Sequence, residues 1–215
     1  TEKTSRAGAQ ERLLEAAMDI FGRDGYEAST TRVIAKEAGV NIAAIPYYYN
    51  GKEGLYQAVI SHIVALIKQQ IDTPIQKINE SNFEATDKDE ALDALETMLI
   101  TMINFMIGSS QGVRVARIIL REQMYPSAAY DLIYSGFMSP VMDALASLIM
   151  AITENTSDRT AKMRALAIVG QIMAFRVARE SIVRSLDLKG YDAGELAEIE
   201  SIILEHTRKI LKPPM

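Results

Sequence analysis

The segment from residue 31 to residue 52, TRVIAKEAGVNIAAIPYYYNGK, constrains the fold more than any other part of this chain. Ala35 lies midway along a short predicted helix, and its small side chain allows a second helix to cross closely. Gly39 stands where that helix must end, because a left-handed residue after a helix favours glycine. Ile45 then points an apolar side chain into the crossing. This spacing predicts a helix-turn-helix, the motif that places its second helix in the major groove of DNA.

The rest of the chain also follows the period of the α-helix, without strand alternation or an internal repeat. Helices are expected over residues 6–23, 31–38, 42–48, 52–71, 89–107, 111–123, 127–152, 158–186 and 192–211. The stretch 72–88 is polar and contains a proline, so we expect a loop there. The predicted fold class is all-α: a three-helix DNA-binding head followed by a bundle of roughly six helices. We expect residues 1–51 to form a DNA-binding domain and residues 52–215 to form a second domain.

Composition is that of an ordinary globular protein, with 48% hydrophobic and 24% charged residues. The absence of cysteine excludes disulfides and thiolate metal sites and fits a reducing compartment. No apolar run approaches the roughly 18–20 residues that a membrane span needs. Residues 1–11 are polar and charged, unlike a signal peptide. We therefore expect a cytoplasmic protein without a membrane partner.

Net charge argues against a nucleic-acid partner, since the whole chain carries −5. The first 55 residues hold seven Lys and Arg against eight Asp and Glu, a balance of 7 − 8 = −1. A phosphate-binding surface is usually basic. Any positive face must therefore come from the placement of a few side chains, namely Arg6, Arg12, Arg32, Lys36 and Lys52.

A family resemblance strengthens the helix-turn-helix prediction. The head resembles that of the TetR family of transcriptional regulators at Phe21, Gly25, Thr30, Thr31, Arg32, Ala35, Gly39, Val40, Ile45, Tyr47, Tyr49, Lys52 and Leu55. Residues 121–133, 137–140 and 165–180 resemble the C-terminal domain of the CecR-like branch. The resemblance covers nearly the whole chain. It implies a ligand-responsive regulator, a repressor in our interpretation, that binds a pseudo-palindromic operator in double-stranded DNA as a homodimer.

The resemblance also implies which side chains meet DNA: Thr31, Arg32, Ile42, Ala43, Ala44, Tyr47, Tyr48 and Lys52. Thr31 and Arg32 would open the first motif helix at the groove edge, where a hydroxyl suits phosphate and arginine can bind guanine bidentately. The apolar turn from Ile42 to Ala44 could contact thymine methyl groups. Lys52 matches the family's phosphate-binding lysine. For Tyr47, plain core packing is an equally good interpretation, and Tyr49 is expected to pack inward.

Pro46 departs from the family pattern. Asn41 is a good N-cap for a helix over 42–48, which would put Pro46 five positions into it. A proline inside a regular helix removes a hydrogen bond and costs up to about 3 kcal/mol. We therefore expect the recognition helix to be kinked, partly 3₁₀, or broken early.

Two C-terminal helices predict the homodimer interface. Small residues form a stripe on the first of them, at Ala167, Gly170, Ala174 and Ala178. The second carries a seam with spacings of 3, 4, 3 and 4, at Leu196, Ile199, Ile203, His206 and Ile210. Such a seam suits packing against another helix. The alternative is that both helices pack only within one chain.

A small apolar or amphipathic effector is the expected ligand of the bundle. Flexible and aromatic side chains suit an adaptable pocket, and charges within apolar helices could orient a polar group. The candidates are Met102, Phe105, Arg121, Glu122, Tyr130, Tyr134 and Arg176. Plain core packing of the methionines and a structural ion pair among the charges are the alternatives. We predict no metal and no cofactor.

Two other functional hypotheses remain at this stage. A DNA-binding adaptor of the same fold would have no small-molecule effector. An enzyme is disfavoured, because the chain has two histidines, His62 and His206, and no catalytic triad, phosphate loop or metal-ligand spacing. Chemistry would then have to rest on a pair such as Glu122 and Arg176.

Overall fold

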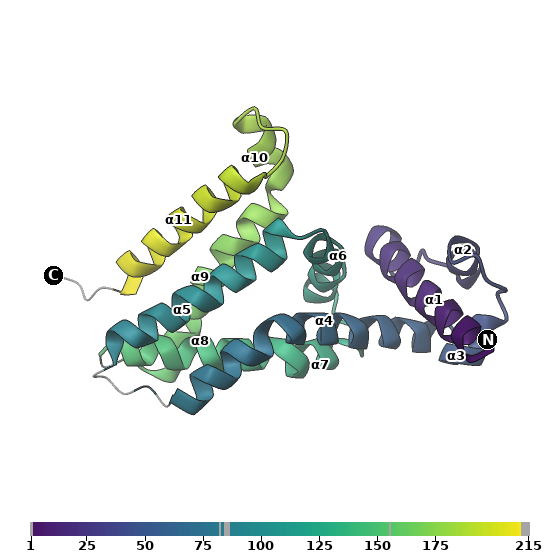
Figure 1. The fold of residues 1–215 in the computed structure, drawn as a ribbon, viewed down its shortest axis with the longest axis horizontal. Helices are drawn as coiled ribbons and strands as arrows, with labels where there is room; N and C mark the ends of the chain where they lie inside the picture. The colour runs from purple at the N-terminus through teal and green to yellow at the C-terminus, as the bar shows by residue number, and fades with distance from the viewer. Residues whose placement is uncertain (1, 82, 84–86, 155, 212–215) are drawn as a thin grey trace. The chain divides into compact units, whose positions relative to one another are not determined.

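The computed structural model describes residues 2–81, 83, 87–154 and 156–211, and residues 2–7 by their backbone alone. Every regular element in these residues is a helix, which confirms the predicted all-α class (Figure 1). The elements in chain order are α1 (Glu2–Asp24), α2 (Thr31–Glu37), α3 (Ala44–Tyr49), α4 (Lys52–Ser81), α5 (Lys88–Ile103), η1 (Asn104–Gly108), α6 (Ser110–Met124), α7 (Tyr130–Ile133), η2 (Tyr134–Met138), α8 (Ser139–Ile152), α9 (Asp158–Val177), α10 (Arg179–Ser185) and α11 (Ala193–Leu211).

The chain forms two compact units. The first holds the residues up to Leu66 together with Val113–Gly136, and the second holds Ile67–Gly112 together with the residues from Phe137 onward. Helix α4 continues from one unit into the other. The predicted functional division between residues 51 and 52 falls at the start of α4, and it stays a prediction.

The first unit is built around the helix-turn-helix. Ala35 and Ile45 are buried where α2 and α3 pack together. Gly39 has a φ of 62°, the left-handed conformation that the sequence predicted at the end of α2. The Val40 N–H donates to the Ala35 carbonyl at 3.0 Å and closes the turn. Helix α1 packs against both helices and buries Leu13, Ala17, Ile20 and Phe21.

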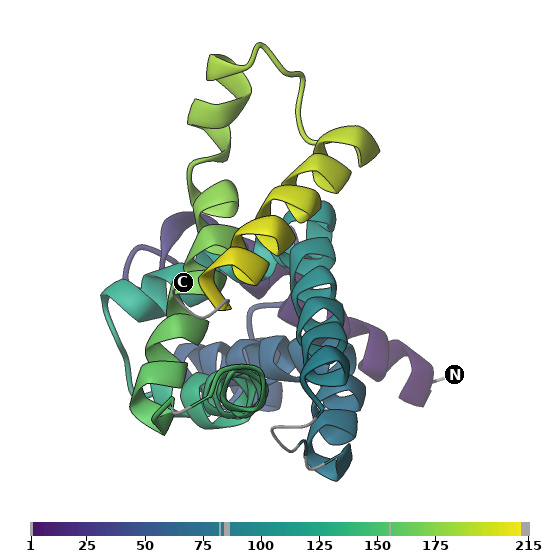
Figure 2. The ribbon, with the colours of Figure 1, turned by 90° about the vertical axis from the view of Figure 1, so that its left-hand side faces the viewer.

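In the second unit α8 and α9 pack along each other, α5 packs on α8, and α11 packs on α5 and α9 (Figure 2). Apolar side chains from all four helices are buried there: Leu95, Leu99, Ile103, Leu145, Leu148, Ile168, Ile172, Ile199 and Ile203. An ion pair between Arg208 and Glu96, with two N–O distances of 2.6 Å, joins α11 to α5. This packing needs no partner chain.

The polar stretch 72–88 is helical as far as Ser81, so the prediction of a loop over its first part is wrong. Pro74 lies inside α4. The apolar face continues past it, because Ile67, Ile71 and Ile78 are all buried. Burial of this face outweighs the hydrogen bond that the proline removes.

Two other boundaries differ from the prediction. The expected helix 158–186 is two helices, α9 and α10, because Ala178 between them has φ −89° and ψ 13°. π-Helical turns extend α5 and precede α8 at Asn104–Gly108 and Tyr134–Met138. The hydrophobic period alone does not distinguish these turns from regular α-helix.

Two helical stretches, Lys88–Gly108 and Tyr130–Ile152, are long and apolar enough to cross a membrane by length and composition. The sequence analysis found no such run, because it looked for an unbroken apolar stretch and both helices contain polar residues between the apolar ones. Core helices of soluble proteins meet the same criterion, so this is weak evidence for a membrane. Since α5 and α8 supply buried leucines to the second unit, we interpret both as core helices.

Candidate functional site

Helix α2 begins with a regular cap and presents Arg32 to solvent. The Thr30 side chain accepts a hydrogen bond from the Val33 N–H at 3.2 Å, as an N-cap should. Thr31 is the first helical residue and is half-buried, whereas Arg32 and Val33 are exposed. Within the described part of the chain, Arg32 has no hydrogen-bond or ion-pair partner. Its guanidinium is therefore available to a ligand.

The turn before α3 presents apolar side chains. The Asn41 side chain accepts from the Ala43 N–H at 2.9 Å, so it caps the turn and not the helix itself. Ile42 and Ala43 lie in this turn and are exposed, while Ala44 opens α3 and is half-buried. Ile42 is 48% exposed, which is far more than a core isoleucine shows.

Pro46 is the third residue of α3, because the helix starts at Ala44 and not at residue 42. The Ile42 carbonyl, which a residue at position 46 would normally bond, accepts instead from the Ile45 N–H at 3.2 Å. The first turn of a helix leaves its N–H groups without helical partners, so proline costs little there. Of the three expected departures the partly 3₁₀ one is present, since the Ala44 and Ile45 N–H groups donate to carbonyls three residues back, those of Asn41 and Ile42. The helix starts two residues later than predicted and then runs unbroken to Tyr49.

The three consecutive tyrosines have different environments. Tyr47 is 70% exposed and packs edge-on against Tyr48, with ring centroids 4.9 Å apart. The Tyr49 hydroxyl donates to the Gln10 carbonyl at 2.9 Å, so Tyr49 faces α1, as predicted. Burial raises the Tyr49 pKa above its usual value. Plain core packing is thus ruled out for Tyr47, whose hydroxyl is open to a ligand.

Lys52 begins α4 and is held by its own chain. Its Nζ lies 4.3 Å from the centre of the Tyr26 ring and donates to the Glu27 carbonyl at 3.4 Å. This cation–π contact fixes the ammonium group next to the helix start. Arg12 is also engaged, because its Nε donates to the Ala38 carbonyl at the end of α2. The Arg6 side chain lies outside the described residues.

The seven predicted effector residues do not form one cluster. Met102, Phe105 and Arg176 belong to the second unit and are half-buried. Tyr130 and Tyr134 belong to the first unit, where their rings stack with centroids 6.4 Å apart. The remaining two, Arg121 and Glu122, line a cavity in the first unit.

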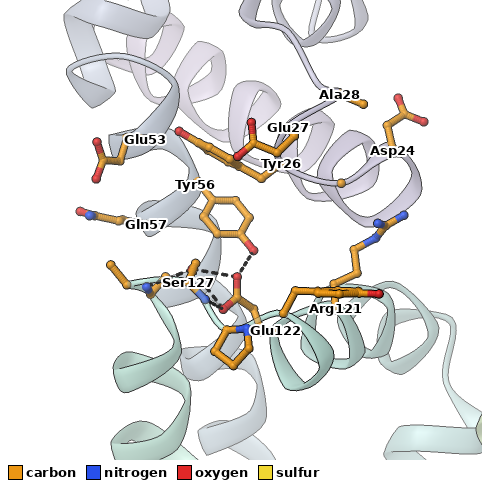
Figure 3. A pocket seen from close by; sticks show the side chains of 15 residues that line it. Asp24, Tyr26, Glu27, Ala28, Glu53, Tyr56, Gln57, Arg121, Glu122 and Ser127 are labelled. Atoms are coloured by element: carbon orange, nitrogen blue, oxygen red, sulfur yellow. Dashed lines mark hydrogen bonds between the residues drawn. The ribbon is translucent and has the colours of Figure 1, made fainter.

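That cavity has a volume of about 530 Å³ and lies between the end of α1, the start of α4 and the end of α6 (Figure 3). Its size is within the range of small-molecule sites. The lining residues are Asp24, Gly25, Tyr26, Glu27, Ala28, Glu53, Tyr56, Gln57, Arg121, Glu122, Tyr125, Pro126, Ser127, Ala128 and Ala129. All of them belong to the first unit.

Glu122 is the buried acid of this cavity, with 3% of its surface exposed. The Tyr56 hydroxyl donates to its Oε1 at 2.5 Å, and the Ser127 N–H donates to its Oε2 at 3.0 Å (Figure 3). The Ser127 hydroxyl donates to Oε1 at 2.9 Å while accepting from the Ala129 N–H. Burial, followed by the hydrogen bond to Glu122 and its negative charge, raises the pKa of Tyr56 far above its usual value.

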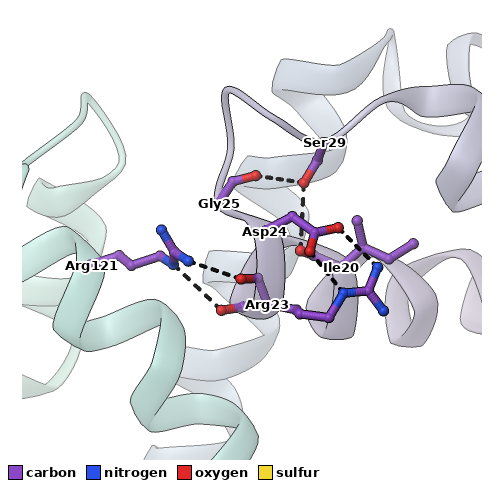
Figure 4. A network of polar contacts seen from close by, with 7 residues as sticks. Ile20, Arg23, Asp24, Gly25, Ser29 and Arg121 are labelled. Atoms are coloured by element: carbon purple, nitrogen blue, oxygen red, sulfur yellow. Dashed lines mark hydrogen bonds and ion pairs between the residues drawn. The ribbon is translucent and has the colours of Figure 1, made fainter.

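The Arg121 side chain points toward the end of α1 (Figure 4). Its Nη2 donates to the Arg23 carbonyl at 2.9 Å and its Nε to the Gly22 carbonyl at 3.4 Å. A cation is favourable at a helix C-terminus, where carbonyl groups lack helical partners. Buried Ser29 closes the same helix end, because its hydroxyl donates to the Gly25 carbonyl at 2.5 Å. Arg121 is therefore a cap of α1.

The nine predicted interface residues divide between surface and core. The whole small-residue stripe is exposed, at Ala167, Gly170 and Ala174 on α9 and at Ala178 directly after it. On α11 Ile199 and Ile203 are buried within the chain, Leu196 is half-buried, and His206 and Ile210 are exposed. His206 Nδ1 lies 3.0 Å from Gln171 Oε1 on α9. On α11, the two central residues of the predicted seam, Ile199 and Ile203, therefore pack inside their own unit.

Sequence reasoning missed several exposed or cavity-lining residues. Val33 is 45% exposed beside Arg32, which a helical projection of α2 could have indicated. Tyr26, Tyr56 and Tyr125 surround the cavity. No local signal identifies them, since they come from three separate parts of the chain. In the described residues no three side chains of His, Cys, Asp or Glu gather as metal ligands.

Two family models match the chain. Residues 13–59 match the model of bacterial regulatory proteins of the tetR family. Residues 91–212 match the C-terminal domain of the HTH-type transcriptional dual regulator CecR. The CecR protein of Shigella flexneri is 33% identical over 208 residues, which cover 95% of this chain and 92% of that protein.

Solved structures share the fold at lower identity. HlyIIR, a hemolysin II transcriptional regulator, is 21% identical, with a TM-score of 0.59 over 92% of this chain and 97% of its own. AibR, solved in complex with isovaleryl coenzyme A and operator DNA, is 17% identical, with a TM-score of 0.66 over 96% of this chain and 100% of its own. These identities establish a common fold alone.

Proposed function

The chain belongs to the TetR family of bacterial transcriptional regulators, with a C-terminal domain of the CecR type, and we propose that it is a ligand-responsive repressor that binds a pseudo-palindromic operator as a homodimer. As a member of this family it is a DNA-binding regulator and not an enzyme. We place it in the cytoplasm, where its DNA partner is.

The observation that carries the proposal is the exposed surface of the helix-turn-helix. Arg32 is unpaired within the described residues and stands beside exposed Val33 on α2, while Ile42 and Tyr47 are exposed on the turn and on α3. A guanidinium can read guanine, and apolar side chains can contact thymine methyl groups. We propose that the full contact set is Thr31, Arg32, Ile42, Ala43, Ala44, Tyr47, Tyr48 and Lys52.

The homodimer is supported by the exposed face of α9. Besides the small-residue stripe, Met163, Leu166 and Val177 are exposed on this helix. A Cβ added to Gly170 would meet nothing within 4 Å, so this face has no cover within the described part of the chain. Two heads are needed to bind two half-sites. We propose that α9 supplies most of the interface, with Ile210 and His206 of α11 at its edge.

Ligand control is the part of the proposal that concerns residues 52–215. AibR, a protein of this fold, was solved with an acyl coenzyme A and operator DNA together, which supports effector control in this fold. A pocket in the second unit around Met102, Phe105 and Arg176 stays a prediction. The coupling needed is modest, since about 1–3 kcal/mol changes operator occupancy several-fold.

The test is fluorescence anisotropy with duplexes that tile the promoter of the protein's own gene. At low salt we expect a complex in which the two heads of one dimer bind one operator. This complex should weaken as salt rises. A duplex with one half-site removed should bind much more weakly. Transcription from that promoter is then compared in cells with and without the gene, and higher transcription without it indicates a repressor. The CecR relative is called a dual regulator, so both directions are measured. Absence of any protein–DNA complex at low salt would contradict the proposal.

A further inference from the structure

The cavity in the first unit has a marked charge bias. Four carboxylates line it, from Asp24, Glu27, Glu53 and Glu122, against the single guanidinium of Arg121. Arg121 is committed to the carbonyls at the end of α1. Arg23, the residue before Asp24 in α1, pairs with it at 2.8 Å and so lowers the Asp24 pKa. Hydrogen bonds to carbonyls leave the positive charge of Arg121 in place, so four carboxylates against the guanidinium groups of Arg121 and Arg23 leave two negative charges, 4 − 2 = 2.

Glu122 is engaged by hydrogen bonds from its neighbours on both of its oxygens. It accepts from three donors, the Tyr56 hydroxyl and the Ser127 N–H and hydroxyl. The Ser127 hydroxyl accepts from Ala129, so its own hydrogen is directed to the carboxylate. The donors that reach Glu122 are neutral hydroxyl and amide groups. A buried carboxyl group whose donors are all neutral favours a cationic ligand.

Aromatic rings form the other walls. The Tyr26 and Tyr56 rings lie 5.0 Å apart and tilted, as Figure 3 shows, and Tyr125 lines the cavity from the loop after α6. Tyrosine faces attract cations, most strongly where water is excluded. The Tyr26 ring already holds the Lys52 ammonium group at 4.3 Å, which shows that a cation is stable at this ring.

We propose that this cavity binds a small organic cation, an ammonium or amidinium group on an apolar body, with its charge near Glu122 and Glu53 and its body against Tyr26 and Tyr56. The volume of about 530 Å³ accommodates a drug-sized molecule. Such a ligand is amphipathic. Binding needs only the first unit, and only its regulatory consequence rests on the proposed function.

The regulatory consequence follows from Lys52. A cation at the Tyr26 ring repels the Lys52 ammonium group and competes with it for the ring. Lys52 is then released from the position in which Tyr26 and the Glu27 carbonyl hold it. A lysine that is no longer held in position must be ordered again when it binds a phosphate, so its contact with DNA is weaker. The ligand should therefore lower operator affinity through the head itself.

Isothermal titration calorimetry of the full chain with benzyltrimethylammonium chloride tests the binding. We expect one saturable site per chain that weakens as salt rises. The uncharged analogue 2,2-dimethylpropylbenzene should bind about 5- to 30-fold more weakly, because it lacks the cation–π and ionic attraction. Equal binding of the two compounds, or no binding of the cation, overturns the proposal.

Variants locate the site. Glu53→Gln should weaken binding about 2- to 5-fold, as for an exposed charge, and Glu122→Gln by about tenfold or more. Ala128→Phe fills the cavity without a change of charge and should abolish binding. Asp72→Asn, an exposed carboxylate elsewhere on α4, is the matched control and should bind like the wild type. Glu122→Gln also removes structural hydrogen bonds and can unfold the protein. In that case Glu53→Gln and Ala128→Phe decide the result. If both of these variants bind the cation as tightly as the wild type, the proposal is overturned.

Operator binding is measured on the same samples to separate the two proposals. If the cation binds in the cavity and operator affinity is unchanged, the cavity site stands and this route of ligand control fails. If operator binding is intact and no cation binds, the cavity site fails and the DNA-binding function stands.

Discussion

Some polar side chains of the helix-turn-helix head already make contacts within their own chain, and others do not. Arg12 caps α2, Tyr49 bonds α1, and Lys52 is tethered to Tyr26. Arg32 and Lys36 are exposed and have no partner among the described residues. A free guanidinium can adjust to a base edge, whereas a tethered ammonium group offers a fixed point charge to a phosphate.

Arg32 and Lys52 should therefore contribute differently to operator binding. Arg32→Ala should cost about 1–3 kcal/mol on the preferred operator and little on random DNA, so it relaxes sequence preference. Lys52→Ala should weaken binding to both and reduce the slope of affinity against salt by about one ion. Anisotropy titrations at several salt concentrations measure both effects. Equal loss on both duplexes for Arg32→Ala would contradict base reading by this residue.

Gly54 is required by a close approach of backbone. A Cβ at this position would overlap the carbonyl oxygen of Tyr49, the last residue of α3. Gly54→Ala should therefore destabilise the fold by about 1–3 kcal/mol, because α3 and α4 must separate. Urea denaturation measures the change.

Gly8→Ala is the matched control for Gly54→Ala. Gly8 is also helical, and among the described side chains its added Cβ would meet only the flexible tip of Arg12, at 3.5 Å. Removal of a helical glycine there should stabilise α1 by about 0.5–1 kcal/mol. Similar effects of the two substitutions would show that the α3–α4 approach is not tight.

At the scale of the helices, proline has opposite consequences in α3 and α4. Pro46 is in the first turn of α3, where no helical hydrogen bond is lost. Pro74 is deep inside α4, where one is lost. The buried isoleucines of α4 hold that helix together despite the loss.

Pro46→Ala should change the free energy of unfolding by less than about 1 kcal/mol, since only the entropy of the unfolded chain is affected. Pro74→Ala should raise it by up to about 3 kcal/mol, because it restores an interior hydrogen bond. Both are measured by urea denaturation. A large stabilisation by Pro46→Ala would show that α3 is strained at its start.

The contact between α4 and α6 makes stability depend on alkaline pH. The folded protein raises the Tyr56 pKa, so Tyr56 binds its proton more tightly when folded. Its contribution is fully present below the unfolded pKa of about 10 and is lost as pH rises above that value.

Tyr56→Phe should cost about 1.5–3 kcal/mol at neutral pH, because it removes a hydrogen bond to a charged group. The variant should also lose less stability than the wild type between pH 10 and higher pH, as denaturation at each pH would show. Some slope remains, because burial also raises the pKa of Tyr26 and Tyr49. Tyr47→Phe, with an exposed ring, is the control and should behave like the wild type. An unchanged slope in Tyr56→Phe would contradict this account.

At the scale of the whole molecule, the exposed face of α9 is the feature that bears on dimerisation. Its exposed positions 163, 166, 167, 170, 174 and 177 follow the helical period, so they share one face. An apolar face of this kind on a soluble chain indicates a protein interface. The second unit already has a core without it, since α5, α8 and α11 pack with the other face of α9.

Leu166→Glu should shift the protein from dimer to monomer in sedimentation equilibrium, because two charges would be buried against each other. Operator affinity should fall by about 100-fold or more as the second head is lost. Met124→Glu is the control, since Met124 of α6 is 70% exposed against 58% for Leu166, and this variant should stay dimeric. A dimer in Leu166→Glu would place the interface elsewhere.

Local patterns were sufficient for the helices and for the turn of the motif. The positions of Ala35, Gly39 and Ile45 follow from steric and conformational rules that act within a few residues. The boundaries of α3, α4 and α9 could not be predicted from local patterns. The start of α3, the continuation of α4 past Pro74 and the break at Ala178 all depend on packing.

The sequence by itself determined the all-α class, the helix-turn-helix and the small-residue stripe of α9, since each is a periodic or short-range property. Only the tertiary structure decided the partners of the charged and aromatic residues. It placed Arg121 on the end of α1 and Glu122 beside Tyr56, although Tyr56 and Glu122 are 66 positions apart in the chain. It also turned Ile199 and Ile203 inward. A sequence pattern gives the face of a helix, but the neighbour of that face is set by how the whole chain packs.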